Sequence, residues 1–389
     1  MTRRSSASRS ILVLSATAGA GHTRAAEALV ETARLLDPAP AVRHQDILGY
    51  TSPLFRKIYS EAYFAVVNRS PELWGYFYRK TEERGANPKR SPLVRIFDHF
   101  NYRRYQEAIE KLRPDAIICT HFLPYAAIAD KLAAPGWEIP FYSVPTDFDA
   151  HALWVNPSVS RYYVANQETS WTLESHGIPP EKIRVTGIPI MPSFARSGRS
   201  AARAEFGVAP SAFTIMIASG GYGINVADNL VPGIAEFLAR YPRKKFHLLI
   251  ACGKNRPLHE KLSRIQAPPN VSISLFGYVP FVDRLMECSD VIVTKSGGLT
   301  TAEALAKGLP MLILDPIPGQ EGRNADYVVE NGAGFRPATI ANLQFRLREL
   351  VDEPGLLPAL RARAKALGRP FAARTILKDI LSDLARRER

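Results

Sequence analysis

Near its N-terminus the chain reads ILVLSATAGAGH, from Ile11 to His22. The apolar run at 11–17 predicts a buried β-strand, and the pattern at 23–36 predicts a helix after it. Glycines let the backbone approach a ligand closely, and a helix N-terminus offers free N–H groups to an anion. This order of strand, glycine-rich turn and helix is typical of a nucleotide-binding α/β unit. Arg24 stands where the dinucleotide fingerprint GxGxxG needs its third glycine, which argues against a dehydrogenase.

The same alternation of apolar runs and helical patterns continues along the 389 residues and predicts parallel sheets covered by helices. Further strands are expected at 116–120, 141–144, 162–165 and 183–188, and then at 213–218, 246–252, 271–276, 291–294 and 311–314. A basic stretch rich in small residues separates the two sets. We therefore expect an α/β fold with two doubly wound domains and a boundary near residue 195.

The charge of the chain favours anionic partners. Fifty Lys and Arg against 37 Asp and Glu give a formal net charge of +13 at pH 7, which suits nucleic acid, phosphorylated substrates or an anionic membrane. The three cysteines are far apart and lack metal-ligand spacing, so we expect no zinc, reduced and buried thiols, and a cytoplasmic protein. The start of the chain also resembles a signal peptide, but cleavage would remove the first expected strand. No apolar run reaches the 18 residues of a membrane span.

The segment at 51–110 interrupts the α/β pattern. It holds twelve aromatic residues, about a third of those in the chain, with eleven basic and seven acidic residues. Aromatic rings mixed with cations suit a membrane interface, and Arg79 and Lys80 are candidate contacts. Two alternatives are a helical excursion that packs its rings inside and nucleic-acid binding by stacking. No RNA-binding motif supports the second alternative.

Two glycine-rich turns provide candidate chemistry. His22 stands at the expected carboxyl end of the first strand, where open α/β sheets bind ligands, and an imidazole there can act as a general base. Its alternative role is a hydrogen bond to backbone at a helix start. The turn SGGYG at 219–223 follows the first strand of the second half and suits a diphosphate.

The most specific stretch is TKSGGLTTAEA at 294–304. Two glycines open a turn, Thr300 can cap a helix, and Glu303 lies one turn inside. A helix N-terminus can hold a diphosphate while a nearby carboxylate accepts ribose hydroxyls, but Glu303 could equally pair with Thr300 in a capping box. The turn PIPGQE at 316–321 could form hydrogen bonds with sugar hydroxyls, or it could be a polar loop without such a role.

Further motifs accompany these turns. They are VPTDF at 144–148 with His151 and Trp154 after it, GIPI at 187–190, CGKN at 252–255 and FGYV at 276–279. Together, over residues 11–370, they resemble the diacylglycerol glycosyltransferases, which comprise monogalactosyldiacylglycerol synthases and processive diacylglycerol β-glucosyltransferases. Plant members usually read GGGHR where this chain has GAGHT, so Arg24 stands one place late.

The resemblance implies a GT-B fold, in which two Rossmann-like domains face each other across a cleft. Residues 1–195 would form the acceptor and membrane-binding domain, 196–369 the UDP-sugar-binding domain, and 370–389 a C-terminal helix that returns to the first domain. It also implies inverting transfer of galactose or glucose from a UDP-sugar to diacylglycerol, without cofactor or obligatory metal. The implied partners are the UDP-sugar, diacylglycerol and an anionic phospholipid surface, not nucleic acid. The protein would act in the cytoplasm, peripherally on the inner face of the cell membrane.

Site residues follow from the same resemblance. His22 would be the catalytic base, and Asp147 would orient it or the acceptor. Donor binding is assigned to Gly220, Gly221, Phe276, Tyr278, Val279, Ser296, Gly297, Gly298, Thr300, Glu303, Gln320 and Glu321. Acceptor or membrane contacts are assigned to Gly21, His151, Trp154, Arg79 and Lys80.

Three rival functions share parts of this pattern. A lipid-linked N-acetylglucosaminyltransferase of peptidoglycan type has the same fold, but the segment at 51–110 and the TDF motif with His151 and Trp154 argue against it. A soluble sugar-nucleotide epimerase would have little use for a basic aromatic segment. A non-enzymatic lipid- or nucleotide-binding module would not need His22 with both glycine turns. The sequence leaves galactose against glucose, and one sugar against several, open.

Overall fold

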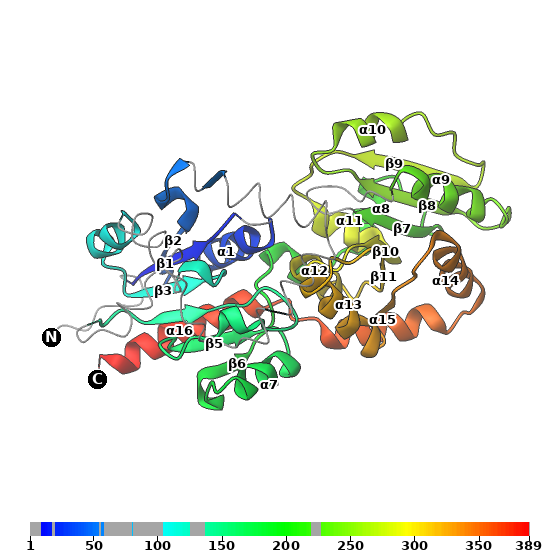
Figure 1. Cartoon of the computed structure of the whole chain (residues 1–389). Helices are drawn as coiled ribbons and strands as arrows, with labels where there is room; N and C mark the ends of the chain where they lie inside the picture. The colour runs from blue at the N-terminus through cyan, green and yellow to red at the C-terminus, as the bar shows by residue number, and fades with distance from the viewer. Residues whose placement is uncertain are drawn as a thin grey trace. The chain divides into compact units, whose positions relative to one another are not determined.

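The computed structural model describes residues 9–17, 20–53, 56–57, 80, 104–124, 137–218 and 227–388. The chain divides into two compact units, which can be followed by colour in Figure 1. The first unit comprises Met1–Pro192, Ile317–Arg323 and Pro370–Arg389, and the second comprises Ser193–Pro316 and Asn324–Arg369.

The first unit is built on a parallel sheet of six strands in the order β2-β1-β3-β4-β5-β6. Its strands are β1 (Ser10–Ser15), β2 (Ala41–Asp46), β3 (Ala116–Cys119), β4 (Phe141–Ser143), β5 (Arg161–Val164) and β6 (Ile183–Val185). Its helices include α1 (Ala20–Ala33), α7 (Gln167–Ser175) and α16 (Ala372–Arg387). Because β1 and β3 are parallel neighbours, the residues that follow them emerge at the same edge of the sheet.

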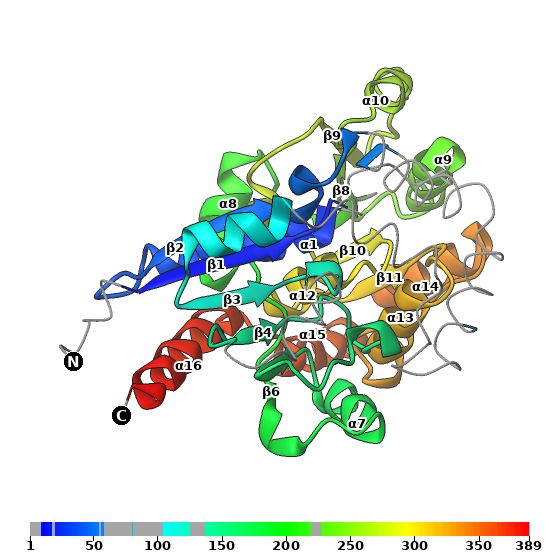
Figure 2. The ribbon, with the colours of Figure 1, turned by 60° about the vertical axis from the view of Figure 1, so that its left-hand side comes forward.

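Alternation along β1 explains how this sheet is covered on both faces. Leu12 and Leu14 join one buried cluster, and Ile11 and Val13 join the opposite one, because successive side chains of a strand point to opposite faces. The second cluster includes Leu29 of α1 together with apolar residues of α16. Both helices, blue and red, can be followed in Figure 2. The C-terminal helix is thus part of the core of the first unit.

The second unit repeats the architecture, with strand order β12-β11-β10-β7-β8-β9, all parallel. Its strands are β7 (Phe213–Ala218), β8 (Phe246–Ala251), β9 (Val271–Phe276), β10 (Val291–Thr294), β11 (Met311–Ile313) and β12 (Gly334–Phe335). Its helices are α8 (Arg199–Glu205), α9 (Ala227–Leu238), α10 (Arg256–Leu262), α11 (Val282–Cys288), α12 (Gly298–Ala306), α14 (Ile340–Asp352) and α15 (Leu356–Leu367). Helix α13 (Gln320–Glu330) begins in the segment that belongs to the first unit.

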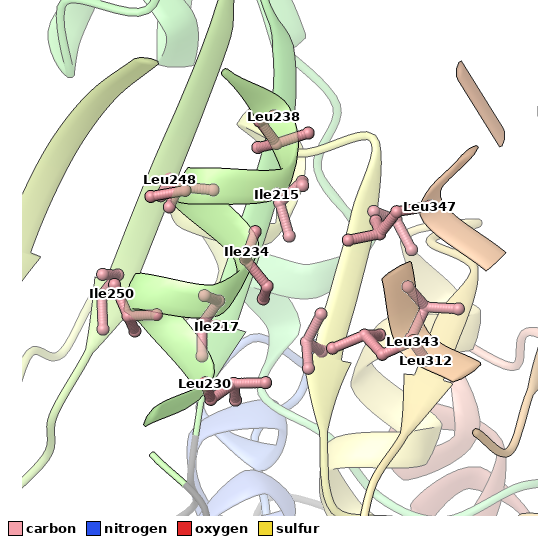
Figure 3. Packing of buried hydrophobic residues seen from close by; sticks show 14 of the residues in the cluster. Ile215, Ile217, Leu230, Ile234, Leu238, Leu248, Ile250, Leu312, Leu343 and Leu347 are labelled. Carbon is pink, nitrogen blue, oxygen red and sulfur yellow. The ribbon is translucent and has the colours of Figure 1, made fainter. Parts of the chain in front are cut away.

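A large buried cluster of the second unit lies between its sheet and helices that include α9 and α14. Figure 3 shows Ile234 of α9 beside Ile215 and Ile217 of β7, with Leu343 and Leu347 of α14 nearby. All five side chains are at most 3% exposed. Burial of this kind contributes about 1.5–3 kcal/mol for each large aliphatic side chain.

The structure confirms the α/β class and all ten expected strands. It adds β2 and β12, which the sequence reading missed. The helix expected at 23–36 is α1 and begins earlier, at Ala20, so Gly21 and His22 lie in its first turn rather than in a loop before it.

The described residues also bear on two further expectations. Cys119, Cys252 and Cys288 are buried and unpaired, as expected, and burial raises the pKa of the Cys288 thiol to about 11. In the part of the chain that the structure describes, no helix is long and apolar enough to cross a membrane.

Candidate functional site

His22 lies in the first turn of α1 and is fixed by residues that follow β3 and β4. The carbonyl oxygen of Thr120 is 2.9 Å from Nδ1 of His22, and the hydroxyl of Thr146 is 2.8 Å from the same nitrogen. A carbonyl can only accept a hydrogen bond, so Nδ1 carries the proton and donates it to Thr120. The lone pair of the neutral ring therefore lies on Nε2.

This environment keeps the His22 ring neutral near pH 7. Burial lowers the pKa of His22 below its ordinary value of 6.5, and it outweighs the opposing effects of the Asp147 charge and the Thr120 carbonyl. Placement at a helix N-terminus also disfavours a cation. A neutral imidazole with a defined tautomer can take a proton, as a general base must.

Two aromatic rings pack against His22, and a third packs against both of them. The ring of His121 packs edge to face against it, with centroids 4.6 Å apart, and the ring of Trp154 lies 6.5 Å away. Phe122 stacks on His121 at 4.4 Å and contacts Trp154 at 6.0 Å. These rings give the base an apolar surrounding, which suits a lipid acceptor better than a highly charged one.

The sequence predicts an acceptor-side role for Trp154 but does not predict one for His121 or Phe122. A signal was present, because both residues follow the β3 run directly, and strands β1 and β3 are parallel neighbours. Residues that follow neighbouring parallel strands converge at one edge of the sheet. His121 and Phe122 therefore belong with His22 by topology, although no motif marks them.

The other acceptor-side candidates have different surroundings. Nδ1 of His151 accepts a hydrogen bond from the backbone N–H of Leu153 at 3.1 Å, which caps the 3-10 helix Ala152–Trp154. His151 is buried, and it thereby helps to place Trp154. Gly21 and Asp147 are half-buried, and Lys80 is exposed. Arg79, Gly220 and Gly221 lie outside the described residues.

In the second unit, the turn after β10 leads directly into α12. Gly297 is the N-cap residue and Gly298 the first residue of the helix, so no side chain at the cap occupies the first N–H groups. Ser296 is fully buried, and its carbonyl accepts a hydrogen bond from the Asn324 amide at 2.9 Å. The α12 N-terminus therefore offers backbone donors to an anion. The turn that carries these donors is fixed by the hydrogen bond from Asn324 to Ser296.

The structure excludes one of the two roles considered for Glu303. Thr300 is the third residue of α12 and does not cap it, and Glu303 is the sixth, since the helix begins at Gly298. A capping box needs its glutamate at the third helical position. The capping-box interpretation is therefore wrong, and the half-buried Glu303 stays a candidate for ribose.

The FGYV motif follows β9 in the same unit. Phe276 is half-buried and packs against Phe206, with ring centroids 5.8 Å apart. Tyr278 is 66% exposed, and the ammonium of Lys254 lies 5.9 Å from its ring centroid. Val279 is half-buried. An exposed ring beside a half-buried apolar side chain is a suitable surface for the flat ring of a nucleobase.

The PGQE turn leads into α13. Gly319 has φ +95°, a left-handed conformation that favours glycine. The backbone N–H of Ile317 donates to the Glu321 carboxylate at 2.8 Å, so this carboxylate stabilises its own turn. Gln320 and Glu321 are both half-buried. The turn is a structured loop, and its role toward sugar stays a prediction.

Comparison with protein families decides the relationship of the chain. Residues 22–190 match the model of monogalactosyldiacylglycerol (MGDG) synthase, and residues 214–367 match the glycosyltransferase family 28 C-terminal domain. These matches confirm the resemblance to the diacylglycerol glycosyltransferase family. The first match contains every residue described around His22, and the second contains the α12 turn.

Curated relatives match the chain over nearly its full length. A protein of Bacillus subtilis (strain 168) named processive diacylglycerol beta-glucosyltransferase is 27% identical over 379 residues, which cover 96% of this chain and 95% of the relative. A protein of the same name from Bacillus cytotoxicus is 28% identical over 374 residues, with 96% and 93% covered.

Solved structures establish the GT-B fold of the chain. Acinetobacter baumannii MurG has a TM-score of 0.62 at 14% identity, with 96% of this chain and 99% of that chain covered. S. aureus MnaA, in a structure with UDP, has a TM-score of 0.62 at 16% identity, with 96% of each chain covered. The calicheamicin glycosyltransferase CalG4 has a TM-score of 0.60 at 16% identity, with 97% and 99% covered. At these identities the likeness extends to the fold alone.

Proposed function

We propose that this protein transfers a hexose, galactose or glucose, from a UDP-sugar to the hydroxyl of diacylglycerol, with inversion at the anomeric carbon. The observation that carries the proposal is the Nδ1–H tautomer of His22, held by the Thr120 carbonyl at 2.9 Å. It leaves a lone pair on Nε2 within an apolar, aromatic surrounding. The names of the Bacillus relatives support diacylglycerol as the acceptor.

In this mechanism the acceptor hydroxyl loses its proton to Nε2 of His22 while its oxygen attacks the anomeric carbon. The bond from that carbon to the UDP oxygen breaks in the same displacement, which inverts the configuration. His22 becomes an imidazolium, which the Thr120 carbonyl and the charge of Asp147 stabilise. General-base assistance of this kind contributes typically 10²–10⁴-fold to the rate.

The leaving UDP gains negative charge, which the α12 N-terminus is suited to stabilise. The free N–H groups that follow Gly297 would donate to the diphosphate. Glu303 would accept the ribose hydroxyls, and the surface of Phe276, Tyr278 and Val279 would contact uracil. Backbone donors make an obligatory metal unnecessary in this account. We assign the reaction to the inner face of the cell membrane, where the protein would act peripherally.

The test is an assay that crosses UDP-galactose, UDP-glucose and UDP-N-acetylglucosamine with diacylglycerol, read by lipid mass spectrometry. We expect a hexosyl lipid from at least one of the first two donors, with a β-linkage by NMR, and unchanged turnover in EDTA. Absence of any hexosyl lipid would refute the proposal. Transfer only to a polyprenyl diphosphate acceptor would favour the peptidoglycan-type enzyme, and donor epimerisation without acceptor would favour an epimerase.

A further inference from the structure

A second imidazole, His121, is built into the site of the candidate base. Its ring is 3% exposed and stands nearly perpendicular to the ring of His22, at an interplanar angle of 83° with centroids 4.6 Å apart. On its other side it stacks on Phe122, at 29° and 4.4 Å. His121 is therefore held between the base and an apolar ring.

The backbone fixes the tautomer of His121. Its Nδ1 accepts a hydrogen bond from the N–H of Leu123 at 3.0 Å, so the proton of the neutral ring lies on Nε2. A charged ring would need a second proton on Nδ1, which would break this hydrogen bond and leave a cation buried. Burial and the neighbouring His22 hold the pKa of His121 well below its ordinary value. The lowered pKa therefore favours a neutral His121 ring near pH 7.

The two rings have opposite tautomers, and each is set by the backbone. His22 donates from Nδ1 to Thr120, whereas His121 accepts at Nδ1 from Leu123. Both anchor points belong to the turn that follows β3. Among the described residues, the charge of Asp147 raises the pKa of His22, and the charge of His22 lowers the pKa of His121.

We propose that His121 is a positioning residue for His22: its neutral ring fixes the plane of the His22 imidazole and shields it from water, so that Nε2 is presented to the acceptor hydroxyl. The inference rests on the proposed role of His22 as base. Its physical basis is that a displacement of a reacting group by about 1 Å can reduce a rate 10²-fold. A ring packed perpendicular to another leaves it little freedom to tilt.

Two variants separate the ring from its hydrogen bond. His121→Ala removes the ring and should lower kcat about 10–100-fold, with the KM for the UDP-sugar within twofold of wild type. His121→Phe keeps a flat ring against His22 and should lose less than His121→Ala. His259→Ala, on α10 of the second unit, is the matched control for loss of an imidazole and should keep full activity. Thermal unfolding shows which variants are folded.

The pH profile distinguishes positioning from a general structural role. Without the shielding ring, the pKa of His22 should rise toward its ordinary value of 6.5. The acid limb of kcat/KM should therefore move to higher pH in His121→Ala and stay low in His121→Phe. A kcat within twofold of wild type in His121→Ala, or a lower kcat with an unmoved acid limb, would overturn the proposal.

A spectroscopic measurement provides a readout without turnover. In ¹⁵N-labelled protein, ring correlation spectra of the eight histidines report tautomer and titration, and the His22 signals are those lost in His22→Ala. We expect an Nδ1–H tautomer for His22 whose titration midpoint rises in His121→Ala; an unmoved midpoint contradicts the coupling. Full activity of His22→Ala would refute the base itself, whereas an inactive His22→Ala beside a fully active His121→Ala refutes only the positioning role.

Discussion

The phenol hydroxyl of Tyr142, on β4, donates a 2.6 Å hydrogen bond to the carboxylate of Asp383 on α16. Two hundred and forty-one positions of sequence separate these residues, so this bond attaches the end of the chain to the sheet that carries the His22 site. Burial alone would raise the pKa of Asp383, but the hydrogen bonds from Tyr142 and Arg387 lower it below its ordinary value. The carboxylate is therefore charged and part of the fold.

Arg161 on β5 is the main cation at this attachment, and its removal should destabilise the first unit. Its guanidinium contacts Asp379 at 2.6 Å and Asp383 at 3.3 Å, and its side chain is 12% exposed. Arg161→Met leaves both carboxylates without this partner, which should cost about 2–3 kcal/mol. Urea unfolding measures the change.

Arg34→Met is the matched control for this substitution. Arg34 pairs with Glu31 on the surface of α1, and its side chain is 67% exposed. Such a pair contributes about 0–1 kcal/mol. Equal unfolding midpoints for the Arg161 and Arg34 variants would contradict a structural role for the α16 attachment.

His22→Ala should abolish turnover and leave the nucleotide site intact. Loss of a general base costs typically 10²–10⁴-fold in kcat, while UDP affinity, measured by calorimetry, should stay within twofold of wild type. Thr146→Val should have a smaller effect of the same kind, since the Thr146 hydroxyl lies 2.8 Å from Nδ1 of His22. Thr146→Ser keeps that hydroxyl and serves as its control. Near-full kcat in His22→Ala would make this histidine a structural residue.

Glu303→Ala should act on donor binding rather than on chemistry. Leaving the ribose hydroxyls without a charged acceptor should weaken UDP binding by about 1.5–3 kcal/mol. The sharper measurement compares UDP with 2′-deoxy-UDP by calorimetry in the wild type and the variant. The wild type should prefer UDP, and Glu303→Ala should lose most of that preference.

Glu260→Ala, which removes an exposed carboxylate from α10, is the control for the Glu303 variant. It should bind both nucleotides as the wild type does. An unchanged UDP dissociation constant in Glu303→Ala would remove this residue from the donor site. The capping box could not then be its explanation, because α12 begins at Gly298.

Stability should fall as the pH drops from 7 toward 5. Burial lowers the pKa of four histidines, His22, His44, His121 and His247, below 6.5. The unfolded chain binds protons at these groups from about pH 6.5 downward while the folded chain does not, so stability present above pH 6.5 is lost as the pH falls toward the lowered values. Each group contributes up to about 1.4 kcal/mol per pH unit.

The melting temperature at pH 7.5 and 5.5 measures this linkage. The range from pH 7.5 to 5.5 tests the histidines and not the carboxylates, because Asp383, whose pKa is lowered, titrates below this range. His121→Phe should reduce the slope by about one proton. A melting temperature that is unchanged or higher at pH 5.5 would contradict the account.

The sequence predicts the layered fold well because apolar strands in a parallel sheet are buried on both faces. It misses β2, which reads AVRHQD, because an edge strand that is partly exposed carries polar residues. It misses β12 because two residues, Gly334 and Phe335, give no periodicity. It also misplaces the start of α12, because Thr300 is a good cap by type whereas the helix begins at the glycine pair before it.

The candidate site is only partly visible in the sequence. His22 can be selected because a motif surrounds it, whereas His121 stands between Thr120 and Phe122 without any pattern. Its importance arises from pairing of β1 with β3, whose residues are separated by about a hundred positions. Contacts of this kind depend on sheet order, which a single sequence does not determine.

The last prediction is that the purified protein binds anionic vesicles and that added salt weakens the binding. Diacylglycerol stays in the bilayer, so the proposed reaction requires contact with its surface. The segment at 51–110 has eleven basic against seven acidic residues and twelve aromatic ones, and most of it lies outside the described residues. Each cation near an anionic surface contributes about 1 kcal/mol, within a Debye length. Flotation with neutral and anionic vesicles at two salt concentrations measures the effect.

Neutralising four of the eleven basic residues of this segment, Arg79, Lys80, Lys89 and Arg90, tests where the contact occurs. Vesicle binding and activity on bilayers should fall, while activity on detergent-dispersed diacylglycerol should be kept. A matched variant removes four exposed cations of the second unit, Arg243, Lys245, Arg256 and Arg264. It carries the same charge change and should bind vesicles more strongly than the first variant. If the membrane contact is made by the segment at 51–110, loss of cations elsewhere weakens it less. Equal losses in both variants would indicate a general charge effect, and equal binding to neutral and anionic vesicles would contradict an electrostatic contact altogether.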